Sequence, residues 1–454
     1  MVGHYESELH PKSGRCLVLQ PSIKAHGYTV LNPSYVSQDS DSRIEEAIGF
    51  ARAIELNVVY DEIININYPK PSSLFGAGVV ARFIGVINYY KIQVVLVDAN
   101  LTPVQQRNLE KEWNVKVIDR TGIILEIFGA RARTKEGRLQ VELASLSYQR
   151  SRLVRSWTHL ERQRGGFGFM GGPGERQIES DRRMIDGRIT TLKKQLKNVR
   201  RTRGLHRHAR QSVPYPIVAL VGYTNAGKST LFNILSKSNV LTKDQLFATL
   251  DPTMRMLQLF SGMEVIISDT VGFVSDLPHE LVESFRATLE EVMEADLLIH
   301  VRDISHRDTI AQKRGVEEVL LKLGAMDKNE VGNSKSVPII EVLNKCDLLS
   351  PEDLENHLSQ LGRHHDRVMV SAKTGKGTNE LLKLIKIELT KQRKEVKLEI
   401  KWEEGALLAW LYERGDVIAR RDTEDCIELS IRLEPNDIAR LDRGKATIRS
   451  DPRI

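Results

Sequence analysis

Residues 217–230 decide the fold of the region around them and read Ile217-Val218-Ala219-Leu220-Val221-Gly222-Tyr223-Thr224-Asn225-Ala226-Gly227-Lys228-Ser229-Thr230. An apolar strand leads into a loop with the pattern GxxxxGKS, and residues 231–235 continue as a helix. In this order, the backbone N–H groups of the loop and the helix N-terminus can surround phosphate oxygens. The stretch therefore predicts a parallel α/β sheet with a phosphate-binding loop, rather than an ordinary glycine turn.

The polar side chains of this loop have distinct expected tasks. We expect Lys228 to reach the β- and γ-phosphates of a nucleotide and the Ser229 hydroxyl to ligate Mg²⁺. The loop residues assigned to nucleotide binding are Gly222, Tyr223, Thr224, Asn225, Ala226, Gly227, Lys228, Ser229 and Thr230.

A second apolar run, residues 264–268, ends in Asp269-Thr270-Val271-Gly272. We expect Asp269 to lie near the metal, through a water molecule. The backbone N–H of Gly272 can donate to the γ-phosphate, so the segment after it would respond to the presence of that phosphate. All four residues are assigned to the nucleotide site, and Gly272 and Lys228 are also assigned to catalysis.

Two further strands end in polar clusters that predict the base. The Asp347 carboxylate can accept from both N1–H and N2–H₂ of guanine, a pair that adenine lacks, so the predicted nucleotide is GTP. Asn344 would support the loop and the base, Lys345 would lie along the ring, and the Ala372 N–H would meet the guanine O6. The residues assigned to the base are Asn344, Lys345, Cys346, Asp347, Ser371, Ala372 and Lys373.

The length of 454 residues exceeds one ordinary core, and domain sizes of roughly 100–200 residues suggest about three domains. Residue patterns predict an α/β multidomain chain with four segments. These are an N-terminal parallel α/β domain at 1–130, a basic helical hairpin at 131–213, a Ras-like G domain at 214–393 and a small α+β module at 394–454.

The N-terminal segment alternates short apolar runs with helical patterns, which is typical of a parallel sheet. Strands are expected at 15–19, 58–64, 92–97 and 115–118. A helix is expected at 102–113, with Thr102 as N-cap and Pro103 at the first helical position. In the C-terminal segment, apolar residues alternate over 396–402 and 427–431, which predicts half-buried strands, and 405–413 are expected to be helical.

Residues 139–160 and 178–199 carry seam residues alternately four and three apart, which predicts two helices that zip together as a coiled coil. The seam residues are Leu139, Leu143, Leu146, Arg150, Leu153, Trp157 and Leu160, and then Ile178, Arg182, Ile185, Ile189, Leu192, Leu196 and Val199. Between them, residues 165–174 include six glycines, which predict an end to the helix and a chain reversal. Ten basic residues are expected outside the seams: Arg152, Arg155, Arg162, Arg164, Arg183, Arg188, Lys193, Lys194, Arg200 and Arg201.

The formal charge of +6 is unevenly distributed. Residues 131–210 hold 21 Lys or Arg and 7 Asp or Glu, a net of +14, whereas the rest holds 45 and 53, a net of −8. A basic segment in an otherwise acidic chain indicates a polyanionic partner. A solvated helical face remains the alternative, and the glycine-rich tip is equally compatible with close approach to a phosphate backbone and with a simple connector.

Three cysteines, Cys16, Cys346 and Cys426, lack the spacing of a metal site or a disulfide framework and are typical of a reducing cytosol. The N-terminus has no apolar run behind a basic start, so we do not expect a secretory signal. No apolar run approaches the roughly 20 residues of a membrane span. We therefore expect a cytoplasmic protein without a membrane span.

Together these motifs resemble the five G motifs of translation-factor-related P-loop GTPases. The segments 247–253, 269–273 and 172–183 are similar to the HflX family, and the resemblance runs from the N-terminal region through the hairpin to the G domain. It implies that Thr249 is the switch I threonine, a ligand of Mg²⁺ and a catalytic residue that closes on the γ-phosphate. It adds to the nucleotide site Phe247, Ala248, Thr249, Leu250 and Asp251. Arg176 departs from the family pattern, which usually has Thr there.

The resemblance and the basic hairpin together imply the large ribosomal subunit and its rRNA as partners of a monomeric, Mg²⁺-dependent GTPase. Its expected task is ribosome splitting or rescue, or translation, under stress. Phe273 stands where Ras-like proteins place a water-positioning glutamine, which predicts slow hydrolysis alone and stimulation by a partner. Alternatively, Phe273 is a core residue and another group takes that role.

Two other functions remain open at this point. One is a ribosome-assembly or RNA-remodelling factor, with a separate ATP-driven activity in the N-terminal half, although that half shows no phosphate-loop lysine. The other is a module that binds GTP without hydrolysing it.

Overall fold

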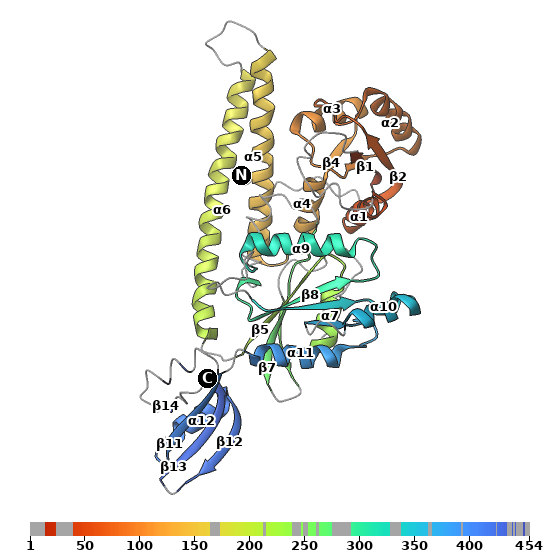
Figure 1. Ribbon diagram of the computed structural model, residues 1–454. Helices are drawn as coiled ribbons and strands as arrows, with labels where there is room; N and C mark the ends of the chain where they lie inside the picture. The colour runs from red at the N-terminus through yellow and green to blue at the C-terminus, as the bar shows by residue number, and fades with distance from the viewer. Residues whose placement is uncertain are drawn as a thin grey trace.

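The computed structural model describes residues 14–23, 40–163, 173–211, 215–237, 247, 253–259, 263–274, 292–326, 337–361, 366–391, 394–423, 425–433, 438, 441 and 448–449. These residues form an N-terminal sheet, a long helical hairpin, a G-domain sheet and a C-terminal sheet (Figure 1). The predicted multidomain α/β fold is confirmed.

The N-terminal sheet is parallel, with the strand order β2-β1-β3-β4. Both faces of β1 are buried: Leu17 packs in a cluster with Phe83, whereas Val18 packs in another with Phe50. Such two-sided burial is why these strands read as continuous apolar runs. The elements are β1 (Arg15–Ile23), α1 (Ser40–Ala53), β2 (Asn57–Ile66), α2 (Ala77–Tyr90), β3 (Val94–Val97), α3 (Pro103–Trp113), β4 (Lys116–Asp119) and α4 (Arg120–Arg131).

The start of α3 follows its predicted signal. Thr102 Oγ1 accepts from the Gln105 N–H at 3.2 Å, and the Gln105 side chain accepts from the Thr102 N–H at 2.9 Å. Because this capping box satisfies two donors that the first helical turn leaves unpaired, the helix begins at Pro103 as predicted.

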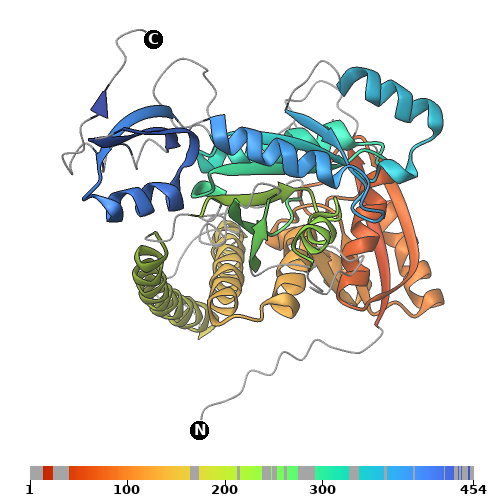
Figure 2. The same cartoon turned by 90° about the horizontal axis from the view of Figure 1, so that it is seen from below.

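Helices α5 (Lys135–Gln163) and α6 (Pro173–Gln211) form the hairpin, and Figure 2 shows them side by side. A seam of Leu139, Leu143, Ile189, Leu192 and Leu196 joins them, as the heptad spacing predicted. We predicted that the helix would be interrupted over residues 165–174. However, α6 begins at Pro173, so the last two of these residues are helical. Residues 164–172 lie outside the described residues.

One prediction for the hairpin charges is wrong. The Arg152 side chain is only 17% exposed and pairs with Asp119 at 2.6 Å, because α5 packs against the N-terminal domain there. Arg183 and Arg188 are exposed and pair with Glu179 and Glu142. Lys193 and Lys194 are exposed as predicted. The side chains of Arg155, Arg162, Arg164, Arg200 and Arg201 lie outside the described part.

The G-domain sheet has the order β10-β9-β8-β5-β7-β6, parallel except for β6. Side chains of α7 and α11 share one buried cluster with this sheet, and side chains of α9 share the cluster on its other face. The elements are β5 (Ile217–Gly222), α7 (Lys228–Ser236), β6 (Thr253–Gln258), β7 (Glu264–Asp269), β8 (Leu297–Asp303), α9 (Thr309–Leu323), β9 (Ile339–Asn344), α10 (Pro351–Leu361), β10 (Arg367–Met369) and α11 (Thr378–Lys391).

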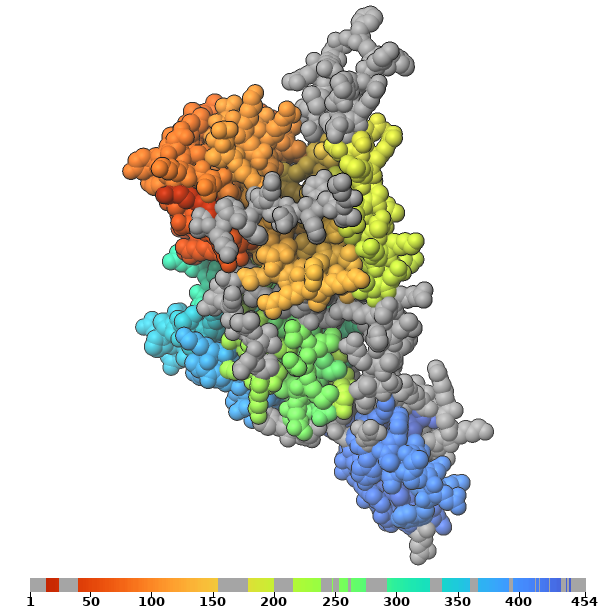
Figure 3. Space-filling view, turned by 180° about the vertical axis from the view of Figure 1, so that it is seen from behind, coloured from red at the N-terminus to blue at the C-terminus, as the bar shows by residue number. Residues whose placement is uncertain are grey.

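The C-terminal module contains an antiparallel sheet of β11 (Lys394–Lys401), β12 (Asp416–Asp422), β13 (Cys426–Leu433) and β14 (Ile448–Arg449), with α12 (Gly405–Arg414). The predicted strands and helix are present. Trp402 was predicted to be half-buried in a strand, but β11 ends before it and Trp402 is 51% exposed. The module lies at the end of the molecule opposite the N-terminal sheet (Figure 3).

The N-terminal domain and the G domain share one buried cluster. It includes Phe50 and Phe128 from the first domain and Tyr223, Phe247 and Phe273 from the second. The carboxyl edge of the G-domain sheet is therefore packed against the N-terminal domain. Among the described helices, none is long and apolar enough to cross a membrane.

Candidate nucleotide site

The phosphate loop joins β5 to α7 at the carboxyl edge of the G-domain sheet. Gly227 has a φ of 93°, and a Cβ atom there would lie 2.2 Å from Asn344 Nδ2. Only glycine fits this close approach without strain. The helix begins at Lys228, so its N-terminus faces the loop.

Lys228 is buried beneath the loop and is 6% exposed. Its Nζ donates to the backbone oxygens of Tyr223 at 2.7 Å and Gly222 at 3.1 Å. Burial lowers the pKa of Lys228 to about 8, although Asp269 acts in the opposite direction. The ammonium thus sits where phosphate oxygens could replace its carbonyl partners.

Two predicted metal-site residues lie together. Ser229 Oγ donates to Asp269 Oδ2 at 2.6 Å, and the neighbouring Thr270 hydroxyl donates to the Leu220 carbonyl at 2.6 Å. The Ser229 hydroxyl at the start of α7 and the Asp269 carboxylate at the end of β7 are hard oxygen donors of the kind that Mg²⁺ prefers. These residues therefore fit a magnesium ion.

Gly272 lies at the point where the phosphate loop meets the strand end of β7. A Cβ at Gly272 would come within 2.9 Å of Thr224 Cα and Cγ2 and 3.0 Å of Lys228 Nζ. The next residue, Phe273, exchanges backbone hydrogen bonds with Gly222 and Thr224 at 3.1 and 2.8 Å. These two hydrogen bonds join the backbone of the phosphate loop to the backbone of the Asp-x-x-Gly segment.

The base motifs converge through Asn344. Its Nδ2 donates to the Ala226 carbonyl at 2.8 Å, and its Oδ1 accepts from the Ala372 N–H at 2.9 Å. The Ser371 hydroxyl donates to Asp347 Oδ1 at 2.6 Å and so orients that carboxylate. Because the Ala372 N–H already has Asn344 as acceptor, its predicted bond to guanine O6 would be shared.

The remaining predicted residues of these motifs surround this core. Lys345 pairs with Asp303 at 2.7 Å at the end of β8. Val271 and Cys346 are buried, whereas Asn225, Asp347 and Lys373 are exposed and Thr230 is half-buried.

Of the switch I residues implied by the resemblance, Ala248, Thr249, Leu250 and Asp251 lie outside the described residues. Phe247 is 2% exposed, and its ring packs on the N-terminal domain. The ring centroid lies 4.6 Å from that of Phe128 and 6.1 Å from that of Phe50. The aromatic ring is therefore committed to the domain interface, which leaves only the backbone of Phe247 for the nucleotide.

A buried ion network beside the loop was missed from the sequence. Tyr223 donates its hydroxyl to Glu46 Oε1 at 2.5 Å, and Arg120 holds the other Glu46 oxygen at 2.7 Å. Arg120 also pairs with Asp98 at 2.5 Å, and these ion pairs hold the Arg120 pKa well above its usual range despite burial. No local pattern reveals this contact, since Glu46 and Tyr223 are far apart in the sequence.

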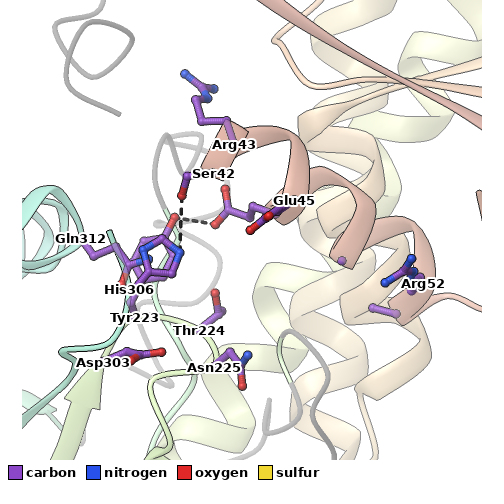
Figure 4. Close-up of a pocket in the computed structure, with 13 residues that line it drawn as sticks. Ser42, Arg43, Glu45, Arg52, Tyr223, Thr224, Asn225, Asp303, His306 and Gln312 are labelled. Atoms are coloured by element: carbon purple, nitrogen blue, oxygen red, sulfur yellow. Dashed lines mark hydrogen bonds between the residues drawn. The ribbon is translucent and has the colours of Figure 1, made fainter. Parts of the chain in front are cut away.

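A cavity of about 320 Å³ lies between α1, the phosphate loop and the start of α9. Its lining includes Ser42 and Glu45 of α1, Thr224 and Asn225 of the loop, and His306 (Figure 4). Ser42 Oγ and His306 Nε2 lie 3.4 Å apart across it. The N-terminal domain thus forms one wall of a space that opens onto the phosphate loop.

A phosphate loop, an Asp-x-x-Gly segment and a guanine motif at one edge of this sheet define a P-loop GTPase. GTPase HflX of Magnetococcus marinus is 45% identical over 435 residues, 96% of this chain and 96% of that protein. The chain belongs to the HflX family of GTPases, which confirms the resemblance, and it binds and hydrolyses GTP.

Other comparisons agree on this family. GTPase HflX of Escherichia coli is 39% identical and aligns over 91% of this chain and 95% of that protein. Family models described as GTP-binding GTPase N-terminal and GTP-binding GTPase Middle Region match residues 41–129 and 131–210. Those described as 50S ribosome-binding GTPase and HflX C-terminal domain match 217–345 and 358–451.

Among solved structures, a GTP-binding protein from Sulfolobus solfataricus in complex with GDP is similar at 21% identity. It aligns over 83% of this chain and 99% of that chain, with a TM-score of 0.44.

Proposed function

We propose that this GTPase associates with the large (50S) ribosomal subunit and its rRNA and acts in ribosome splitting or rescue, or translation, under stress. The observation that carries the proposal is the basic hairpin. Its two helices meet in a buried apolar seam, and Lys193, Lys194 and Lys197 are exposed on α6. Such a surface favours a phosphate backbone. The family description, 50S ribosome-binding GTPase, supports the same partner.

At the nucleotide site we propose roles that follow the geometry. Lys228 and the Gly272 N–H contact the γ-phosphate, Asp347 accepts from guanine, and Ser229 with Thr249 ligates magnesium. When bound, Mg²⁺ neutralises charge that develops on the β- and γ-phosphates. The phosphate loop supplies fixed N–H donors, which need no reorganisation during hydrolysis.

We further propose a monomeric, cytoplasmic protein whose hydrolysis is slow alone and is stimulated by the ribosome. The Phe273 ring is 1% exposed and lies in the core, so it serves packing, and it has no group that could hold water. A partner that closes the switch segments would raise this slow rate. Static light scattering of the purified chain would test the monomer, and two copies per particle would contradict it.

The main test is sedimentation with 50S subunits in a GTP analogue and in GDP. We expect stronger binding with the analogue, and equal binding in both states would reject the nucleotide switch. In parallel, the triple variant Lys193→Gln, Lys194→Gln, Lys197→Gln should lower the slope of log affinity against log salt by about 2–3, because each neutralised phosphate releases counterions.

The matched control is Lys383→Gln, Lys391→Gln, Lys401→Gln, which removes the same charge from exposed positions outside the hairpin. It should bind 50S subunits like the unmodified chain. Equal loss in both triple variants would show that net charge matters and that the hairpin face does not.

A further inference from the structure

The water that attacks the γ-phosphate needs a hydrogen-bonding group beside it. The residue after Gly272 does not supply one. Phe273 follows Gly272 directly, but its ring is buried in the cluster shared by the two domains. A phenyl ring offers no lone pair or proton to water. Another group near the γ-phosphate must therefore position the water.

Thr224 has a hydroxyl that the fold leaves unused. The residue is 6% exposed, and among the described residues its Oγ1 has no hydrogen-bond partner. A buried hydroxyl without a partner is unusual unless a ligand or water satisfies it, because its hydrogen bonds to water are lost on folding.

The position of Thr224 adjoins the groups assigned to the γ-phosphate. A Cβ atom at Gly272 would lie 2.9 Å from both Cα and Cγ2 of Thr224, and 3.0 Å from Lys228 Nζ. The methyl group of Thr224 therefore faces Gly272, which turns the hydroxyl to another side. Figure 4 shows the Thr224 oxygen on the side that faces α1, and Thr224 is one of the residues that line the cavity between the two domains.

The cavity itself suits water. Its volume of about 320 Å³ has room for several water molecules, and most of the residues that line it carry polar side chains. Two other polar residues of its wall already have partners. His306 Nδ1 accepts from the Asp308 N–H at 3.1 Å, and Glu46 is held by Tyr223 and Arg120. Thr224 is the wall residue that lies against Gly272, and its buried hydroxyl has no partner among the described residues.

We propose that the Thr224 hydroxyl positions the water that attacks the γ-phosphate, with the cavity beneath α1 as the chamber that supplies it. Thr224 Oγ1 accepts a hydrogen bond from the water. The water oxygen forms a bond to the γ-phosphorus, the bond from phosphorus to the β,γ-bridging oxygen breaks, and GDP leaves with that electron pair. The water proton passes to a γ-phosphate oxygen, so Thr224 is unchanged at the end of the step.

The test compares Thr224→Val, which keeps the shape and removes the hydroxyl, with Thr224→Ser, which keeps the hydroxyl. Single-turnover GTP hydrolysis is measured for the chain alone, so the result does not depend on ribosome binding. We expect Thr224→Val to lower the hydrolysis rate about tenfold, the value of one hydrogen bond, and Thr224→Ser to stay within about threefold. Affinity for a fluorescent GDP should be unchanged in both.

Thr390→Val is the matched control, because the Thr390 hydroxyl only bonds to its own helix, at 2.9 Å from the Lys386 carbonyl. It should hydrolyse GTP at the normal rate. Hydrolysis by Thr224→Val within twofold of the normal rate would overturn the proposal. An equal loss of GDP affinity would overturn it too, since the residue would then only shape the loop. If Thr224→Val does not fold, Thr224→Ala against Thr224→Ser decides by the same two readouts.

Discussion

The N-terminal sheet and the G-domain sheet are both largely parallel, and both carry polar residues at the carboxyl ends of their strands, but they use those residues differently. In the N-terminal sheet, Asp98 and Arg120 pair with each other, and Arg120 also holds Glu46. In the G domain, the same edge carries a glycine-bounded loop with a buried Lys228 beside Asp269.

The difference shows that sheet topology places polar groups at one edge without deciding their use. Where side chains of opposite charge meet at the carboxyl edge of a sheet, they pair with one another and form an ion network. Where glycines bring backbone N–H groups together, the edge can take up a ligand's phosphates. In this molecule the two edges also touch, because Tyr223 of the phosphate loop donates to Glu46.

Removal of the Arg120 guanidinium should disrupt the ion network at the carboxyl edge of the N-terminal sheet. Arg120→Met leaves the buried Asp98 carboxylate and the partly buried Glu46 carboxylate without this partner, and we expect the unfolding free energy of the N-terminal domain to fall by about 3–5 kcal/mol. Urea unfolding followed by hydrogen exchange in β1 and β3 would measure it. Arg82→Met is the control, because Arg82 pairs with Glu62 at 52% side-chain exposure. Equal unfolding free energies of the two variants would contradict a stabilising role of Arg120 in the ion network.

Removal of the Lys228 ammonium, at the carboxyl edge of the G-domain sheet, should instead lower the rate of GTP hydrolysis. Lys228→Ala is expected to slow single-turnover GTP hydrolysis by about 10²–10³-fold, since a fixed positive group at the γ-phosphate is lost. Lys237→Ala, at the exposed end of α7, should behave like the unmodified chain. A Lys228→Ala rate above one tenth of normal would place the triphosphate elsewhere.

The guanine contact should be the next largest effect. Asp347→Ala removes a charged acceptor, and we expect GTP affinity to fall by about 1.5–3 kcal/mol while the weak affinity for ATP stays the same. Competition titration with both nucleotides would measure this. Asp353→Ala on α10 is the control. An unaltered preference for GTP would show that another group selects the base.

The lowered pKa of Lys228 predicts how GTP binding depends on pH. Phosphate binds the charged ammonium, so affinity should fall as pH rises through the value of about 8. Between pH 7 and 9 the expected loss is about tenfold. Lys228→Arg keeps its charge over this range, so its affinity should show no such step. A step of the same size in that variant would assign the titration to another group.

The smallest effect is expected at the surface of the hairpin. Glu142→Gln removes the exposed pair with Arg188, and the unfolding free energy should change by less than about 0.5 kcal/mol. Thermal unfolding would measure it. A larger loss would mean that surface pairs help the seam to hold the two helices together.

Much of the fold follows from local patterns. The capping residues Thr102 and Pro103 set the start of α3, and the spacing of Leu139, Leu143 and Ile189 set the hairpin seam. Errors arose where tertiary packing overrides a pattern. Arg152 looked like a solvated charge, but α5 lies against Asp119 of the other domain, and Trp402 followed an alternating run although the strand ends before it.

The sequence by itself determined the phosphate loop and the guanine motif, because glycines, a lysine and a carboxylate at fixed spacing suffice to recognise their ligand. Only the tertiary structure decided what surrounds them. The hydrogen bond from Tyr223 to Glu46 and the packing of Phe247 on Phe128 join residues from separate parts of the chain. The cavity that Thr224 lines is likewise formed by residues of both domains. Such contacts depend on how two domains pack, and no local spacing of residues encodes that.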